Sequence, residues 1–221
     1  MDKNENNGEI IGNFSVALGL FDYINPIFYG TTVITILIKM FGQMSTPIYI
    51  LFVIGAIISL IFGLSIPTVN LIVGLGKLQF KMPVNLVSFV NTGILLSGIA
   101  LVSHVVGMKP LTLLLVLLGA ALIIGFLWYK TGKFNTVAVL IGAVGYLMIY
   151  ASMITLSVRS GVMLPVFLYA FAICLFVFLC LVGILANLKN AKVHWVIEIS
   201  NVVCQFSVAL GTVILLCGLC G

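Results

Sequence analysis

The stretch PLTLLLVLLGAALIIGFLWY, residues 110–129, contains no charged side chain and lies between Lys109 and Lys130. An α-helix needs about 20 apolar residues to cross the hydrocarbon core of a bilayer. A membrane β-strand would instead alternate apolar and polar residues over about ten positions. This stretch is apolar on all of its faces. It therefore predicts a transmembrane helix.

The composition of the whole chain supports the same conclusion. Of its 221 residues, 62% are hydrophobic and only 7% are charged, whereas a soluble domain carries about 25% charged residues. So few charges cannot cover a water-facing surface of ordinary size. We therefore expect an integral membrane protein whose apolar surface faces lipid.

Six further apolar stretches predict an all-α bundle of about seven transmembrane helices joined by short loops. The expected spans cover residues 14–39, 47–73, 83–106, 110–129, 134–158, 163–188 and 193–219. Residues 1–12 are expected to form a short polar tail, and residues 1–221 a single transmembrane helical domain. Because the loops are short, helices adjacent in sequence should be antiparallel neighbours in space.

Prolines and small residues predict local features of the spans. Pro26 follows Asn25 inside the first span and should kink or break that helix, and Pro67 should bend the end of the second. Small residues at four-residue spacing should let helix backbones approach closely. These are Gly55, Ser59 and Gly63; Gly93 and Ser97; Ala121 and Gly125; and Ser207 and Gly211.

The basic residues in the loops predict the orientation of the chain. Seven of them fall on the side of the N-terminus: Lys3, Lys77, Lys81, Lys130, Lys133, Lys189 and Lys192. Only Lys39, Lys109 and Arg159 fall on the other side. The excess favours a multi-pass protein of the cell membrane with a cytoplasmic N-terminus. Basic residues placed in this way indicate contact with membrane lipid and not with nucleic acid.

Ionisable side chains within the spans are costly in a bilayer, so they are the first functional candidates. Asp22 precedes Pro26, where it either carries function or caps the helix that restarts there. Glu198 lies three residues after Trp195, which indicates a position about one turn below the membrane surface. His104, near the far end of the third span, is interpreted as a hydrogen-bonded surface histidine.

The sequence offers no pattern for a bound metal or an independent active site. His104 and His194 lack a matching spacing for haem or a metal, and Cys217-x-x-Cys220 is a single pair near the end of the chain. No nucleophile–base arrangement or phosphate-binding loop is present. We therefore expect no haem or metal in this chain, and we do not expect an enzyme acting alone.

Polar side chains gather at the end of the bundle that carries the N-terminus. By the expected topology this group comprises Asp22, Asn25, Asn70, Lys77, Lys81, Asn85, Asn135, His194, Glu198 and Asn201. Such a group could frame a site for an amphiphile, with its polar head at the rim and its apolar tail among the helices. The alternative is that this end is simply the more polar membrane interface.

Four segments resemble a known family. The first is Phe21 to Gly30, followed by Thr31-Thr32-Val33, and the second is Gly63-Leu64-Ser65-Ile66-Pro67 with a basic loop and Pro83-Val84-Asn85. The third is residues 119–136, and the fourth carries Glu198, Val202 and Phe206. Together they resemble the membrane anchor subunit of DMSO reductase-type molybdenum oxidoreductases. At the family's histidine, glutamate and arginine positions this chain has Gly63, Asn85 and Val202.

The resemblance implies a membrane anchor subunit that exchanges electrons with menaquinone or menaquinol. It implies menaquinone as the cofactor, and an iron–sulfur subunit and a molybdopterin catalytic subunit as partners. The expected quinone-binding residues are Asp22, Asn25, Asn70, Asn85 and Glu198, with Asp22 or Glu198 accepting the proton. Lys77 and Lys81 would dock the partner.

A small multi-pass transporter or channel is the alternative reading. The break at Asn25-Pro26 and the bend at Pro67 could then line a path, because broken helices do so in transporters.

Overall fold

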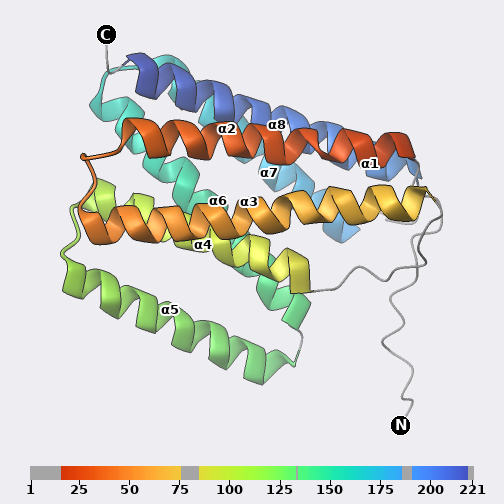
Figure 1. Ribbon diagram of the computed structural model, residues 1–221, viewed down its shortest axis with the longest axis horizontal. Helices are drawn as coiled ribbons and strands as arrows, with labels where there is room; N and C mark the ends of the chain where they lie inside the picture. Colours follow the sequence, from red (N-terminus) through yellow and green to blue (C-terminus); the bar gives the residue numbers. More distant parts are fainter. Residues whose placement is uncertain (1–15, 76–84, 133, 186–190, 219–221) are drawn as a thin grey trace.

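The computed structural model describes residues 16–75, 85–132, 134–185 and 191–218, and every regular element in that part is an α-helix (Figure 1). The helices are α1 (Val16–Asp22), α2 (Ile24–Lys39), α3 (Thr46–Gly74), α4 (Asn85–Val106), α5 (Pro110–Thr131), α6 (Phe134–Arg159), α7 (Met163–Leu185) and α8 (Ala191–Gly218). With α1 and α2 forming one span, seven helical segments are long and apolar enough to cross a membrane. The predicted all-α bundle of seven spans is confirmed, and the chain is a multi-pass helical membrane protein.

The helix ends lie close to the predicted ones because the sequence marks them locally. Residues 110–129 fall within α5, and residues 47–73 fall within α3. Four glycines with positive φ, namely Gly42, Gly107, Gly132 and Gly161, lie in the connections between helices. At the end of α5, for example, Gly132 has a φ of 59° and its N–H donates to the Trp128 carbonyl. Only glycine adopts this left-handed conformation readily, so the helix ends there.

The two prolines inside the spans act differently. The first span is interrupted at Tyr23, between α1 and α2, one turn before Pro26, so the predicted break is confirmed. In contrast, α3 continues through Pro67 to Gly74. Both prolines lack an N–H, so each leaves the carbonyl four residues earlier without its helical partner. These carbonyls belong to Asp22 and Gly63.

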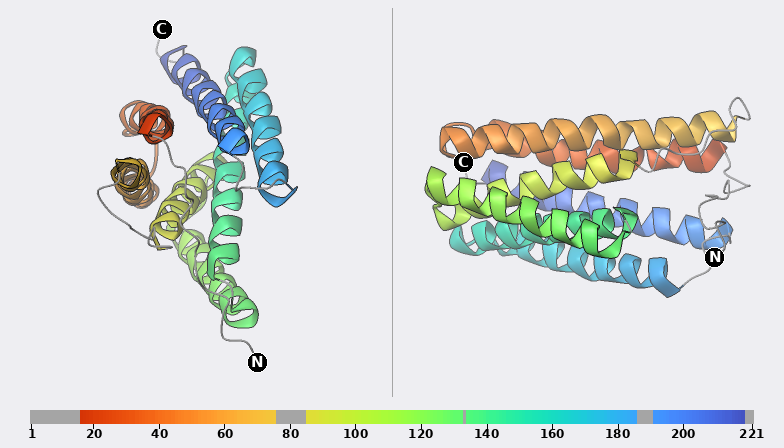
Figure 2. Two further views of the ribbon diagram at one scale, coloured as in Figure 1. Left: turned by 90° about the vertical axis from the view of Figure 1, so that its right-hand side faces the viewer. Right: turned by 90° about the horizontal axis from the view of Figure 1, so that it is seen from below.

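Two helix pairs, α3 with α4 and α4 with α6, pack most closely, followed by α7 with α8 and α2 with α8. The pairs α3–α4 and α7–α8 are sequence neighbours, as the short loops predicted, whereas α4–α6 and α2–α8 are not. Helix α5 stands at the outer edge of the bundle and packs mainly against α6 (Figure 2). Only 6% of the apolar stretch of α5 is buried inside the bundle, whereas 50% of the corresponding stretches of α4 and α8 is buried. Nearly all of α5 is therefore left to face lipid.

Glycine lets the central helices approach more closely than any side chain would permit. A Cβ at Gly93 would lie 2.6 Å from the Gly55 carbonyl oxygen and from the Ser59 nitrogen. Likewise, a Cβ at Gly98 would lie 2.7 Å from the Gly145 carbonyl oxygen. The predicted close approach is therefore confirmed for Gly55 on α3 and Gly93 on α4, and α4 meets α6 in the same way.

The prediction of close approach was wrong for two other glycines. At Gly63 and Gly125 a Cβ would meet no atom within 4 Å. Gly63 borders a cavity, and Gly125 is exposed on the outer face of α5. The spacing of small residues in the sequence therefore does not show whether a helix face packs against a neighbouring helix or is left open.

The α3–α4 contact should be sensitive to a single methyl group. Gly93→Ala places a Cβ against backbone atoms, and overpacking of this kind costs about 1–3 kcal/mol. We expect a lower midpoint of thermal unfolding in detergent for this variant. Gly119→Ala, whose Cβ meets nothing within 4 Å, is the matched control and should unfold at or above the wild-type temperature. Equal midpoints for the two variants would contradict this packing.

Candidate functional site

Two polar stripes face each other across the contact between α2 and α8. The first consists of Asp22, Asn25 and Tyr29, and the second of Glu198, Asn201 and Gln205. In each stripe the spacing is three and then four residues, which places the side chains on one face of a helix. Because α1 and α2 run in the same direction as α8 (Figure 1), corresponding members of the stripes lie at similar depth in the bundle.

Four of the residues predicted from the sequence meet at one end of these stripes. Asn25 Nδ2 donates to Glu198 Oε2 at 3.0 Å, and Asn70 Nδ2 donates to Asp22 Oδ2 at 3.0 Å. The Glu198 side chain also lies close to the Asp22 carboxyl group. We call Asp22 and Glu198 the carboxyl pair. Helices α1, α2, α3 and α8 each contribute one residue to this network.

The capping role considered for Asp22 is not observed. The residue that precedes α2 is Tyr23, and no side chain caps that helix. Asp22 is instead the last residue of α1, and its carboxylate accepts a hydrogen bond from α3. Its position is therefore explained by contacts between helices and not by the local helix end.

A cavity of about 220 Å³ extends from Asp22 into the bundle. Its lining residues come from α1, α2, α3, α4, α6 and α8: Asp22, Asn25, Pro26, Tyr29, Ser59, Gly63, Ile66, Pro67, Val90, Ile94, Tyr146, Asn201 and Gln205. Both residues whose carbonyls are released by proline, Asp22 and Gly63, belong to this wall. Unpaired backbone is tolerated at membrane depth where it lines a polar cavity, and this placement fits that rule.

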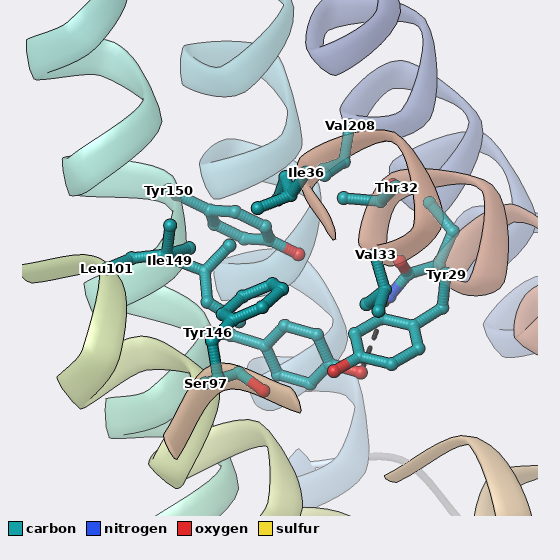
Figure 3. A pocket seen from close by; sticks show the side chains of 12 residues that line it. Tyr29, Thr32, Val33, Ile36, Ser97, Leu101, Tyr146, Ile149, Tyr150 and Val208 are labelled. Carbon is teal, nitrogen blue, oxygen red and sulfur yellow. Dashed lines mark hydrogen bonds between the residues drawn. The ribbon is translucent and has the colours of Figure 1, made fainter. Parts of the chain in front are cut away.

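The deep end of the cavity is formed by tyrosines. The Tyr29 hydroxyl bonds to the Ser59 hydroxyl at 2.8 Å, and Gln205 Nε2 donates to the Tyr146 hydroxyl at 3.5 Å. Figure 3 shows the hydroxyls of Tyr29 and Tyr146 pointing toward one another from α2 and α6. Since Tyr29 lies two turns beyond Asp22, the polar wall reaches about 10 Å into the bundle.

Beyond the tyrosines lies a second, much smaller void. Its volume is about 10 Å³, which is room for about one water molecule. Its wall includes the apolar side chains of Ile36, Phe52, Leu101 and Val208. In this conformation the polar cavity therefore ends near the middle of the bundle.

One polar atom at the site has no partner within the described part of the chain. Asn25 is only 9% exposed, and its Oδ1 accepts no hydrogen bond. Leaving a buried acceptor unpaired costs about 1–3 kcal/mol. The same side chain lines the cavity and holds Glu198 through Nδ2, so Oδ1 lies beside the carboxyl pair and is available to a ligand or a water molecule.

The side chains of the other predicted site residues lie outside the described part of the structure. Asn85 is the first residue of α4, but its side chain is not among those described, and Lys77 and Lys81 lie outside the described residues. His104 is half-buried near the opposite end of α4. Within the described residues, no three His, Cys, Asp or Glu side chains come together in a way that could hold a metal ion.

Sequence reasoning missed Tyr29, Gln205 and Tyr146 as parts of the site. A signal for the first two was present, because each continues the three-and-four spacing that begins at Asp22 or Glu198. Tyr146 had no such signal, since α6 reaches the cavity only through the packing of α6 against α4.

No protein-family model matches this chain, and no curated protein or solved structure is significantly similar to it.

The cavity should be reachable from water, and cysteine labelling tests this. We expect Gly63→Cys, in a chain whose five native cysteines are replaced by alanine, to react with a charged methanethiosulfonate reagent. Gly125→Cys on the lipid-facing side of α5 should react far more slowly, because a thiol in hydrocarbon does not ionise. Equal protection of both thiols would mean that the cavity is sealed from water.

Proposed function

We propose that this chain is the membrane anchor subunit of an oxidoreductase complex and that its cavity binds the head group of a quinone of the menaquinone class. The observation that carries the proposal is a carboxyl pair at the end of a cavity of about 220 Å³ between membrane spans. A bound quinone supplies two-electron, two-proton carrier chemistry, which requires a proton acceptor beside the ring. The resemblance to anchor subunits supports the same function.

The cavity wall suits a flat ring with oxygen atoms at opposite edges. Polar groups stand at both ends, with Asp22 and Asn25 at one and Tyr146 and Gln205 at the other. Between them lie apolar side chains such as Val90 and Ile94, which would contact the ring faces. Ligand sites are commonly lined by apolar side chains, with a few polar groups that fix the orientation of the ligand.

The carboxyl pair would hold and pass the proton in this function. Asp22 lines the cavity, and in this proposal its carboxylate would exchange a proton with the ligand. Glu198, in contact with Asp22, would be the next acceptor. Asn25 and Asn70 would position the two carboxyl groups through the hydrogen bonds they donate.

The proposed partners are an iron–sulfur subunit and a molybdopterin catalytic subunit. In the sequence, Lys77 and Lys81 lie between the end of α3 at Gly74 and the start of α4 at Asn85. A basic docking segment there would bring an acidic partner to the same membrane face as the carboxyl pair. From the count of basic residues we propose that this face is cytoplasmic.

A transporter of small ligands is the second candidate, and one specific observation favours it. The first span is interrupted at Tyr23 beside the cavity, and Pro26 and Pro67 release carbonyls into the cavity wall. Broken helices at a central site are typical of secondary transporters. In this conformation the path is closed by Ile36, Phe52 and Leu101, so transport would need a second conformation.

Quinone binding should depend on the free volume beside Gly63. We expect a soluble naphthoquinone to bind the wild-type chain in lipid nanodiscs saturably, measured by calorimetry. Gly63→Phe fills the cavity and should weaken binding at least about tenfold, which corresponds to about 1.4 kcal/mol. Gly119→Phe, on the outer helix α5, is the control and should bind like the wild type. Absence of saturable binding in the wild type would remove the quinone from the proposal.

The anchor role predicts that the chain does not purify alone. We expect gentle extraction from native membranes to recover it with iron–sulfur and molybdenum-containing subunits, detected by metal analysis of the eluted complex. With that complex, Asp22→Asn and Glu198→Gln should each slow quinol oxidation severalfold, since each removes a proton acceptor. A chain that elutes free of iron and molybdenum would instead support the transporter.

A further inference from the structure

The carboxyl pair has more oxygen atoms than the neighbouring amide groups can bind. One oxygen of each carboxylate is bound by an amide, Asp22 Oδ2 by Asn70 and Glu198 Oε2 by Asn25. Asp22 Oδ1 and Glu198 Oε1 are not held by these amides. Among the described residues, the charged neighbour of Glu198 is Asp22 and not a lysine or arginine. Two carboxylate charges in contact repel, so either a shared proton or a metal cation must lie between them, and a shared proton serves only the two carboxyl groups.

A second observation, independent of the carboxylates, points to a ligand at the same place. Asn25 is more than nine-tenths buried, and its Oδ1 has no partner. This oxygen belongs to the amide whose nitrogen holds Glu198, so it cannot turn away without breaking that bond. A buried amide oxygen beside two carboxylates is a third acceptor without a donor.

The backbone adds further acceptors at this position. The interruption of the first span at Tyr23 ends α1 at Asp22, and the carbonyl end of a helix carries partial negative charge. The Asp22 carbonyl also lacks the hydrogen bond that residue 26 would supply, because residue 26 is proline. Every one of these groups presents oxygen, and oxygen is the ligand that hard cations prefer.

We propose that Asp22, Glu198 and the Oδ1 atom of Asn25 form a binding site for one monovalent metal cation, of which sodium is the expected ion, at the end of the cavity. The proposal does not depend on what the cavity itself binds, and it holds for either function considered above.

The number of free oxygens favours a monovalent ion over calcium or magnesium. Calcium takes six to eight oxygen ligands, and magnesium demands near-ideal octahedral geometry. The site offers three side-chain oxygens that accept no hydrogen bond from Asn25 or Asn70, and the amide N–H groups of these two residues already offset part of the negative charge. The adjoining cavity of about 220 Å³ leaves room for water to complete a monovalent shell.

Sodium binding can be measured on the whole chain in lipid nanodiscs. We expect equilibrium dialysis with radioactive sodium, at constant ionic strength held by choline chloride, to give saturable binding of about one ion per chain, as the single site implies. Asp22→Asn and Glu198→Gln keep the shape of each side chain and should each weaken sodium binding at least about tenfold. Asn25→Ala should weaken it as well.

Asn91→Ala is the matched control, because Asn91 is also an intramembrane asparagine, but its side chain bonds to the Ala138 carbonyl on α6. Its sodium affinity should equal that of the wild type. Sodium affinity that is unchanged in both carboxyl variants would overturn the proposal.

Two measurements on the wild type need no variant. Sodium should raise the midpoint of thermal unfolding relative to choline at equal ionic strength, since a ligand that binds only the folded state stabilises it. Absence of stoichiometric sodium binding in the dialysis overturns the site even if a variant fails to fold. Saturation by calcium at lower concentration than sodium overturns the monovalent assignment.

Discussion

In the hydrocarbon core of a bilayer, every backbone N–H and C=O must find its partner inside the protein. This constraint makes each long apolar stretch of the chain a helix, and it explains why every regular element in the described part is helical. It also gives special weight to each place where a backbone bond is missing. Pro26 and Pro67 create two such places, and both lie at the wall of the same cavity.

Most polar side chains within the spans obey the same rule. Many serine and threonine hydroxyls donate to the carbonyl four residues earlier, as Ser59 does to Gly55 and Ser157 does to Met153. These bonds satisfy the hydroxyl within its own helix. The carboxyl pair cannot be satisfied in this way, because a carboxylate only accepts hydrogen bonds. It is held by amides from other helices, Asn25 and Asn70, and therefore depends on the tertiary arrangement.

The packing of the bundle explains where a cavity can exist. The backbones of α3 and α4 touch at Gly55 and Gly93, so no side chain can separate them there. Two turns along α3, Gly63 meets no neighbour, and the helices leave a space that the tyrosines of α2 and α6 only partly fill. One helix thus uses glycine first to close an interface and then to leave a cavity open.

The sequence by itself determined the membrane class, the seven spans and most of their ends, because apolar length, proline and left-handed glycine act locally. It also identified Asp22, Asn25, Asn70 and Glu198, because ionisable and amide side chains within apolar stretches are rare. Only the tertiary structure decided that these four side chains meet, that Gly63 is open and Gly93 is packed, and that Tyr146 joins the site. Those facts depend on which helices pack side by side, and α2 with α8 or α4 with α6 are pairs that lie apart in the chain. Local physical rules fix each helix, but they do not fix its neighbours.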